Sequence, residues 1–167
     1  MSKLLLVALL LCGSLAFAQA KKAPAETKKT APAADPWIGN WKLDIAHSKF
    51  HDPAPKEETL TVDAASKDAV KYSTKGTAAD GSAYTEAYEG KADGKEYPLT
   101  RNGQPVAKIA YHRNTAHNST GKATVTEGVT FTESATVSND GKTLTVKQHF
   151  TTPAGEFDNV AIFHKIS

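Results

Sequence analysis

Polar side chains that could contact a small molecule stand in step with aromatic ones in this sequence. Each is two positions from its apolar neighbours: Glu86 from Tyr84 and Tyr88, Glu133 from Phe131, and Gln148 from Phe150. Alternate residues of a β-strand share one face, so inward-pointing faces would bring carboxyl, amide and phenol groups into one apolar cavity. A buried carboxylate needs a partner, a water molecule or a ligand. A few convergent polar groups in an apolar pocket are what orient a small molecule.

With two further tyrosines, these positions form the predicted ligand-binding set, whose aromatic members would supply apolar walls. The set is Tyr72, Tyr84, Glu86, Tyr88, Tyr111, Phe131, Glu133 and Gln148. Two alternatives stay open. The faces could point outward, or the polar groups could satisfy one another in a structural network within a filled core.

Sequence signals for catalysis and metal binding are weak. The histidines at positions 47, 51, 112, 117, 149 and 164 do not form a His-Glu-x-x-His motif. No Gly-x-Ser-x-Gly motif and no phosphate-binding glycine loop occurs. A hydrolase using Glu86 or Glu133 would rest on carboxylate burial alone. We therefore predict no enzyme activity, no catalytic or metal-ligating residues and no cofactor.

Residues 1–18 have the organisation of a secretory signal peptide. Lys3 gives a positive start, the run from Leu4 to Leu11 is apolar, and Ala16-Phe17-Ala18 is a small-x-small cleavage site. The apolar run is shorter than the roughly 20 residues that span a bilayer, so no transmembrane segment is expected in the mature chain. Cys12 would be removed with the signal, because Leu11 before it is too large for a lipoprotein cleavage site.

Residues 19–35 are rich in Lys, Ala and Pro and have no aromatic or β-branched aliphatic residue to bury. They are predicted to be a disordered linker. Residues 36–167 then form the single folded domain, with 15 Lys and Arg against 16 Asp and Glu. This near-neutral balance gives no electrostatic reason to expect nucleic-acid binding. The domain has no Cys, which excludes a disulfide scaffold, a thiolate zinc site and a Cys nucleophile.

The folded domain is predicted to be all-β. It contains only 4 Leu but 17 Thr, and alternation with a period of two recurs where a helical apolar stripe does not. Strands are expected around Leu60, Val70, Tyr84–Tyr88, Val106–Arg113, Val129–Val137, Leu144–Phe150 and Asn159–Lys165, with a polar edge strand at Thr115–Lys122. Asp-Gly and Asn-Gly turns separate these runs. We predict an antiparallel up-and-down barrel of about eight to ten strands, because closure removes exposed edges.

The opening Gly39-Asn40-Trp41 resembles the Gly-x-Trp start of lipocalin and wider calycin barrels. Four segments are similar to small exported bacterial proteins with lipocalin-like domains: Asp35–Leu43, Ser48–Phe50, Asp140–Val146 and Asn159–Phe163. The resemblance implies a lipocalin-like β-barrel in which Gly39 allows a tight bend and Trp41 closes the floor. Lys165 is expected to lie over the Trp41 ring, where lipocalins often place an arginine.

The expected function is binding of a small, partly apolar or amphipathic molecule inside an exported barrel, periplasmic or secreted. The alternative is a non-catalytic structural or interaction module of the cell envelope with a filled core. Thr-rich outer faces and the Lys/Pro linker suit that second interpretation.

Overall fold

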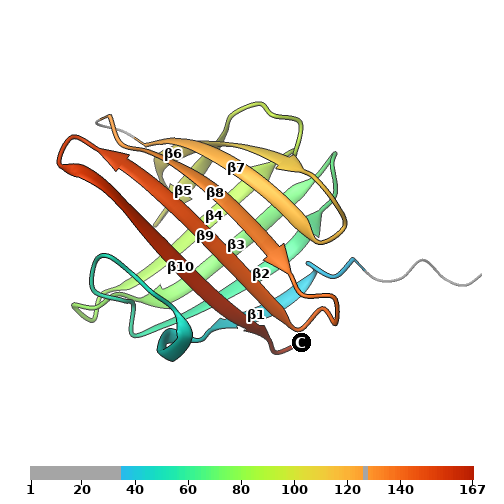
Figure 1. Cartoon of the computed structure of the whole chain (residues 1–167), viewed down its shortest axis with the longest axis horizontal. Coiled ribbons are helices and arrows are strands. Elements are labelled where there is room, and N and C mark those ends of the chain that lie inside the picture. Colours follow the sequence, from blue (N-terminus) through green and yellow to red (C-terminus); the bar gives the residue numbers. More distant parts are fainter. Residues whose placement is uncertain (1–34, 126–127) are drawn as a thin grey trace, which may run out of the picture. The chain divides into compact units, whose positions relative to one another are not determined.

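The structure, a computed structural model, describes residues 35–125 and 128–167. The predicted signal peptide with Cys12, and residues 19–34 of the predicted linker, lie outside the described residues. The described part of the chain contains ten strands and one short 3-10 helix (Figure 1). Within it there is no helix with the length and apolar character needed to cross a membrane.

The strands follow one another along the chain. They are β1 (Gly39–Leu43), β2 (Glu57–Ala65), β3 (Val70–Thr77), β4 (Ala83–Gly90), β5 (Tyr97–Arg101), β6 (Gln104–Arg113), β7 (Asn118–Val125), β8 (Thr130–Val137), β9 (Thr143–Thr152) and β10 (Gly155–Lys165). The 3-10 helix, Ile45–His47, follows β1 and starts at Asp44, whose carboxylate accepts a hydrogen bond from the His47 amide at 3.2 Å. Most other connections are short turns, which favour antiparallel neighbours.

Every strand pairs antiparallel with its neighbours in the chain, and the sheet closes into a barrel at β1. Trp41 on β1 lies opposite Leu60 of β2 on one side and opposite Lys165 of β10 on the other. This arrangement confirms the predicted all-β, antiparallel up-and-down barrel, with ten strands. Because the described sheet is closed, each of its strands has a paired neighbour on both sides. No edge strand is left to pair with the edge of another molecule, which is the usual start of edge-to-edge aggregation.

Two details of the strand prediction were wrong. The segment predicted as a polar edge strand is β7, which pairs with both β6 and β8 inside the closed sheet. Strand β5 was not predicted, because it has five residues and contains Pro98, and a proline normally argues against a strand. Pro98 is exposed, and the register of β5 against β6 shifts between Leu99 and Thr100, the kind of irregular pairing that tolerates proline.

Strand β10 does not direct its β-branched residues into the cavity. Val160 and Ile162 are the β-branched residues of this strand, but Ala161 and Phe163 line the interior. Val160 also forms a β-bridge with Lys49, which lies outside the named strands. The two residues exchange backbone hydrogen bonds of 2.7 Å in both directions. The segment after β1 therefore lies alongside β10, and β-branched side chains there are partly buried without facing the cavity.

Two groups of buried apolar residues make up the core of the described barrel. The first gathers around Trp37, Trp41, Leu144 and Phe163, and the second around Tyr88, Tyr111, Ile109 and Phe131. The largest fully buried side chains come from both groups and are less than 2% exposed: Trp41, Tyr88, Ile109, Leu144 and Val137. Tyr72 is partly buried and packs against both groups, and so lies at the boundary between them.

Candidate ligand-binding cavity

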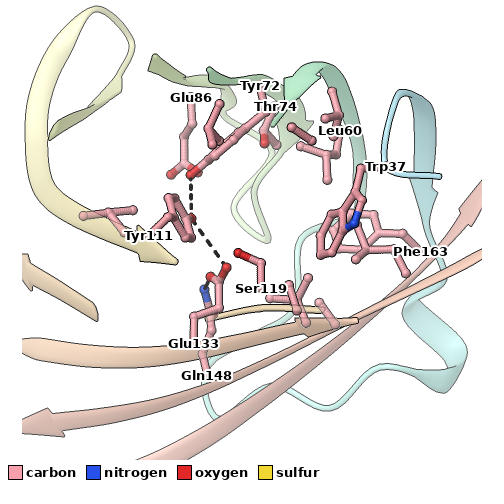
Figure 2. A pocket seen from close by; sticks show the side chains of 18 of the residues that line it. Trp37, Leu60, Tyr72, Thr74, Glu86, Tyr111, Ser119, Glu133, Gln148 and Phe163 are labelled. Carbon is pink, nitrogen blue, oxygen red and sulfur yellow. Dashed lines mark hydrogen bonds between the residues drawn. The ribbon is translucent and has the colours of Figure 1, made fainter. Parts of the chain in front are cut away.

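The barrel interior contains a partly open cavity of about 270 Å³, lined by residues of both core groups (Figure 2). Residues of the predicted ligand-binding set line it: Tyr72, Glu86, Tyr111, Phe131, Glu133 and Gln148. Figure 2 shows Glu86, Tyr72, Tyr111, Glu133 and Gln148 gathered toward one side, with Leu60, Trp37 and Phe163 toward the other. The cavity therefore has a polar side and an apolar side.

Four of these side chains form a continuous hydrogen-bonded path, named here the polar chain: Tyr72, Tyr111, Glu133 and Gln148. The Tyr72 and Tyr111 hydroxyl oxygens are 3.1 Å apart, and the Tyr111 hydroxyl donates to Glu133 Oε1 at 3.4 Å. Gln148 Nε2 donates to Glu133 Oε2 at 2.9 Å. Because Tyr111 donates its single hydroxyl hydrogen to Glu133, Tyr72 is the donor to Tyr111. The polar chain thus converges on one carboxylate from strands β3, β6 and β9.

The fold makes room for Tyr111 at this point. Its partner across the β6–β7 ladder is Gly121. A side chain at Gly121 would bring its Cβ to 2.7 Å from Tyr111 Cε1, closer than carbon atoms normally approach. The glycine lets the Tyr111 ring lie across β7 and direct its hydroxyl toward Glu133 on β8.

Burial shifts the acid–base behaviour of the polar chain. The pKa of Glu133 is raised, chiefly because burial disfavours the carboxylate, and the hydrogen bonds from Gln148 and Tyr111 offset part of that effect. The pKa values of Tyr72 and Tyr111 are raised well above the ordinary value, first by burial and then by the nearby Glu133 carboxylate. Both phenols therefore stay protonated as hydrogen-bond donors near neutral pH.

A second polar group, the Arg101 cluster, contains Glu58, Tyr84, Glu86 and Arg101. The Tyr84 hydroxyl donates a very short hydrogen bond to Glu58 Oε2, and the Arg101 guanidinium carbon lies 4.3 Å from the Tyr84 ring centroid. Arg101 Nη1 also lies 3.5 Å from Glu86 Oε1. Burial raises the pKa of both Glu58 and Glu86, and the charge of Arg101 opposes that increase. Glu58 and Glu86 line the cavity, whereas Tyr84 is not among its lining residues.

Tyr88 belongs to the wall behind the cavity and not to its lining. It is 1% exposed, stacks on Tyr72 with ring centroids 5.3 Å apart, and meets Tyr111 edge-on at 5.1 Å. Its hydroxyl donates to the Ile109 carbonyl at 3.3 Å. Burial, with smaller contributions from Tyr97 and Asp93, raises the pKa of Tyr88 to about 12. Tyr88 therefore holds the two cavity tyrosines in place.

The tryptophan cluster, made of Trp37, Trp41, Arg113 and Lys165, lies on the apolar side. Trp41 is fully buried and its indole Nε1 donates to the Trp37 carbonyl at 2.9 Å. Lys165 Nζ lies 4.6 Å from the Trp41 ring centroid and donates to the carbonyls of Pro36 and Ile38, both at 2.8 Å. Burial lowers the pKa of Lys165. The lysine therefore ties β10 to the segment before β1.

Gly39 begins β1 in a backbone conformation that favours glycine, with φ at +133°. A Cβ at this position would collide with the Ser167 carbonyl oxygen. The next amide, Asn40 N, donates to that same oxygen at 2.8 Å. Gly39 thus allows the last residues to pack against the start of the barrel, directly beside Trp41.

Arg113 was not predicted as part of any site. Its guanidinium carbon lies 5.1 Å from the Trp37 ring centroid. Its Nη2 contacts both Asp35 carboxylate oxygens at 3.2 Å, and its remaining bonds go to the carbonyls of Ala65, Thr115 and Ala116. Arg113 is the last residue of β6 and Glu58 is the second residue of β2. Because neighbouring strands alternate in direction, β2 and β6 run the same way, so these two residues lie toward opposite ends of the barrel.

The sequence prediction missed seven polar or aromatic lining residues: Trp37, Phe50, Glu58, Thr74, Arg113, Ser119 and Phe163. For three of them a signal was present. Glu58 is in step with Leu60 and Val62, Thr74 with Tyr72, and Arg113 with Ile109 and Tyr111. Thr74 is the one polar, non-aromatic residue among the buried residues of the described part of the chain, at 6% exposure, and it lines the cavity.

Among residues 35–125 and 128–167, no three His, Cys, Asp or Glu side chains are grouped so that they could hold a metal ion. Comparison with known proteins gives no match, either to a family model or to a curated protein sequence.

Proposed function

We propose that this protein is an exported, lipocalin-like barrel that binds one small, partly apolar molecule in its cavity. The observation that carries the proposal is a cavity of about 270 Å³ with a hydrogen-bonded carboxylate on one side and aromatic and aliphatic walls on the other. A small barrel has room for its own side chains or for one small ligand, and here the side chains leave space.

The size of the cavity sets the size of the ligand. Apolar cavities of roughly 150 Å³ bind benzene. The cavity in this barrel is larger, which suits a ring carrying a short substituent or a short branched chain. Its polar groups would fix the orientation of such a ligand, and Trp37, Leu60 and Phe163 would cover its apolar part.

The polar groups support binding more than they support catalysis. The hydrogen bonds that Glu133 accepts come from Gln148 and Tyr111, a neutral amide and a neutral phenol, and neither is a general base that could activate a nucleophile. Export, inferred from residues 1–18, would deliver the barrel to the periplasm or the medium. There it would carry or sequester its ligand.

A cavity-filling variant tests this proposal. Ala161 lines the cavity, so we expect Ala161→Phe to occupy the space and abolish binding. Ala110→Phe is the matched control, because Ala110 alternates with the lining residues Ile109 and Tyr111 and so lies on the outer face of β6. The measurement is the rise in melting temperature with indole, 2-naphthol or 2-phenylethanol, since a ligand stabilises the state that binds it.

The proposal fails if none of these molecules raises the melting temperature of the unmodified protein. It also fails if Ala161→Phe folds and responds to them as strongly as Ala110→Phe does, because binding would then lie outside the barrel.

A further inference from the structure

The charges lining the cavity are unbalanced. Three carboxylates line it, from Glu58, Glu86 and Glu133, against one cationic side chain, Arg113. That guanidinium is already engaged by the Asp35 carboxylate and by three backbone carbonyls. The cavity therefore has an excess of acceptors and of potential negative charge.

Glu133 differs from the other two carboxylates. Glu86 has Arg101 at 3.5 Å, and the same guanidinium lies over Tyr84, the donor to Glu58. No Lys, Arg or His nitrogen of the described residues lies within 4 Å of Glu133, whose partners are a neutral amide and a neutral phenol. Each Glu133 oxygen accepts one hydrogen bond, and a carboxylate offers about four acceptor positions, so about two remain open.

The surroundings of Glu133 suit a cationic group. Tyr72 and Tyr111 line the cavity beside it with ring centroids 6.4 Å apart, and aromatic rings attract ammonium ions. Thr74, two residues from Tyr72 on the same face of β3, adds a hydroxyl-bearing side chain to this part of the cavity wall. Opposite Thr74 on β4 is Glu86, the second cavity carboxylate on this side.

We propose that the ligand is a small aralkyl or alkyl amine, bound with its ammonium group against Glu133 and its hydrocarbon part against Trp37, Leu60 and Phe163. This inference rests on the proposed function and narrows it to one chemical class. The ammonium donates to the open acceptor positions of Glu133, while the Tyr72 and Tyr111 rings cover it.

Acid–base chemistry supports this choice. In the empty cavity, burial favours the neutral carboxyl of Glu133, which limits the cost of an uncompensated charge. An arriving ammonium stabilises the carboxylate instead. Where Glu133 is protonated before binding, the ion pair forms as its carboxyl proton passes to solvent and the ammonium keeps all of its own protons.

A carboxylate ligand is the main competitor, and the geometry argues against it. It would need a cation on the wall, but Arg113 is committed to Asp35 and to the carbonyls near Trp37. On the Glu133 side it would meet like charge. A neutral alcohol would bind through the polar chain alone, without an ion pair.

Three matched molecules separate these cases: 2-phenylethylamine, 2-phenylethanol and 3-phenylpropionate, titrated into the protein by calorimetry near neutral pH. We expect the amine to bind at least about tenfold more tightly than the alcohol, and the carboxylate to bind most weakly. In Glu133→Gln we expect amine affinity to fall about tenfold and alcohol affinity to fall by less, because the glutamine amide still offers the alcohol a hydrogen-bonding partner. Glu156→Gln, at an exposed position on β10, should leave all three affinities unchanged.

A second measurement needs no variant. Because the pKa of Glu133 is raised, amine affinity should fall as pH is lowered and the carboxylate becomes protonated, whereas alcohol affinity should change less. Equal affinity for amine and alcohol would overturn the amine assignment while leaving the binding function intact. Tightest binding of 3-phenylpropionate would also overturn it and would redirect attention to Arg113. Failure of all three molecules to bind, with no response to indole or 2-naphthol either, would reject the binding function itself.

Discussion

The tryptophan cluster and the polar chain both place polar atoms inside the same barrel, but they satisfy them differently. Donors of the tryptophan cluster end on backbone carbonyls, with the Asp35 carboxylate as an additional acceptor for Arg113. In the polar chain, side chains bond to other side chains. A backbone acceptor is fixed by the fold, whereas a side-chain acceptor with open positions can add a ligand.

This difference assigns a structural role to the tryptophan cluster and a place in the proposed ligand site to the polar chain. The tryptophan cluster joins the segment before β1 to β10 and to the connection after β6, so its loss should unfold the barrel. The polar chain joins strands that are already held together by the sheet. Its loss should therefore lower the free energy of unfolding by less, and under the proposed function its main effect should be on ligand affinity. The predictions below test that contrast.

The largest effect is expected at Trp41, which is fully buried. Trp41→Ala should lower the free energy of unfolding by about 4 kcal/mol, because it opens a large cavity and removes the ring beneath Lys165. Urea unfolding followed by circular dichroism measures the change. Ile166→Ala is a control at a side chain that is 59% exposed, where little change is expected. A loss no greater in Trp41→Ala than in this control would remove the structural role of the tryptophan cluster.

Arg113→Lys comes next, with an expected loss of about 2 kcal/mol. Lysine keeps the charge but cannot reach Asp35 and several carbonyls at once with one ammonium group. Lys108→Arg, on the exposed face of the same strand, is the matched exchange and should change stability little. Equal unfolding midpoints for the two variants would show that the fork geometry of Arg113 is dispensable.

Tyr72→Phe should cost about 1 kcal/mol, because it removes one partly buried hydrogen bond to Tyr111 and leaves the ring stacked on Tyr88. Tyr97→Phe removes an exposed bond to Asp93 and should cost less. Chemical denaturation of both variants gives the comparison. A greater loss from Tyr97→Phe would place the stabilising phenol outside the cavity.

The smallest effect expected is on the pH dependence of stability, through Glu133. Its pKa is raised in the folded state above the ordinary 4.5, so the folded protein binds more protons than the unfolded chain between those two values. The contribution of Glu133 is most favourable below pH 4.5 and declines as pH rises through its raised pKa. Glu133→Gln should therefore destabilise less, or stabilise more, relative to the parent as pH rises through that window. Parallel stability–pH curves would contradict the assigned burial.

The sequence predicted the fold class well because alternation is local. A strand with one face toward the interior alternates apolar and polar residues along its own sequence. Segments with this alternation almost uninterrupted are Val129–Val137 and Leu144–Phe150. The five-residue β5 is too short to carry it and contains Pro98. It is held in place by its neighbours β4 and β6, information that lies elsewhere in the chain.

Part of the cavity lining was predictable from the sequence, but the geometry of the cavity was not. Period-two alternation placed Tyr84 and Tyr88 on the same face as Glu86, and all three are partly or fully buried. Their contacts with other strands differ, and these separate the three residues: Tyr84 donates a hydrogen bond to Glu58, and Tyr88 stacks on Tyr72. Pairings across strands, such as Gly121 opposite Tyr111, depend on register, which the sequence alone does not specify.

The pairing of β1 with β10 has a consequence for how the barrel folds. Asn40 and Ser167, whose side chains meet at 2.8 Å, are 127 positions apart in the chain. Residues this far apart in the chain must meet before the barrel can close, because β1 pairs with β10 as well as with β2. Such non-local pairing is slow compared with the formation of hairpins between consecutive strands, so we expect closure to be the last step of folding.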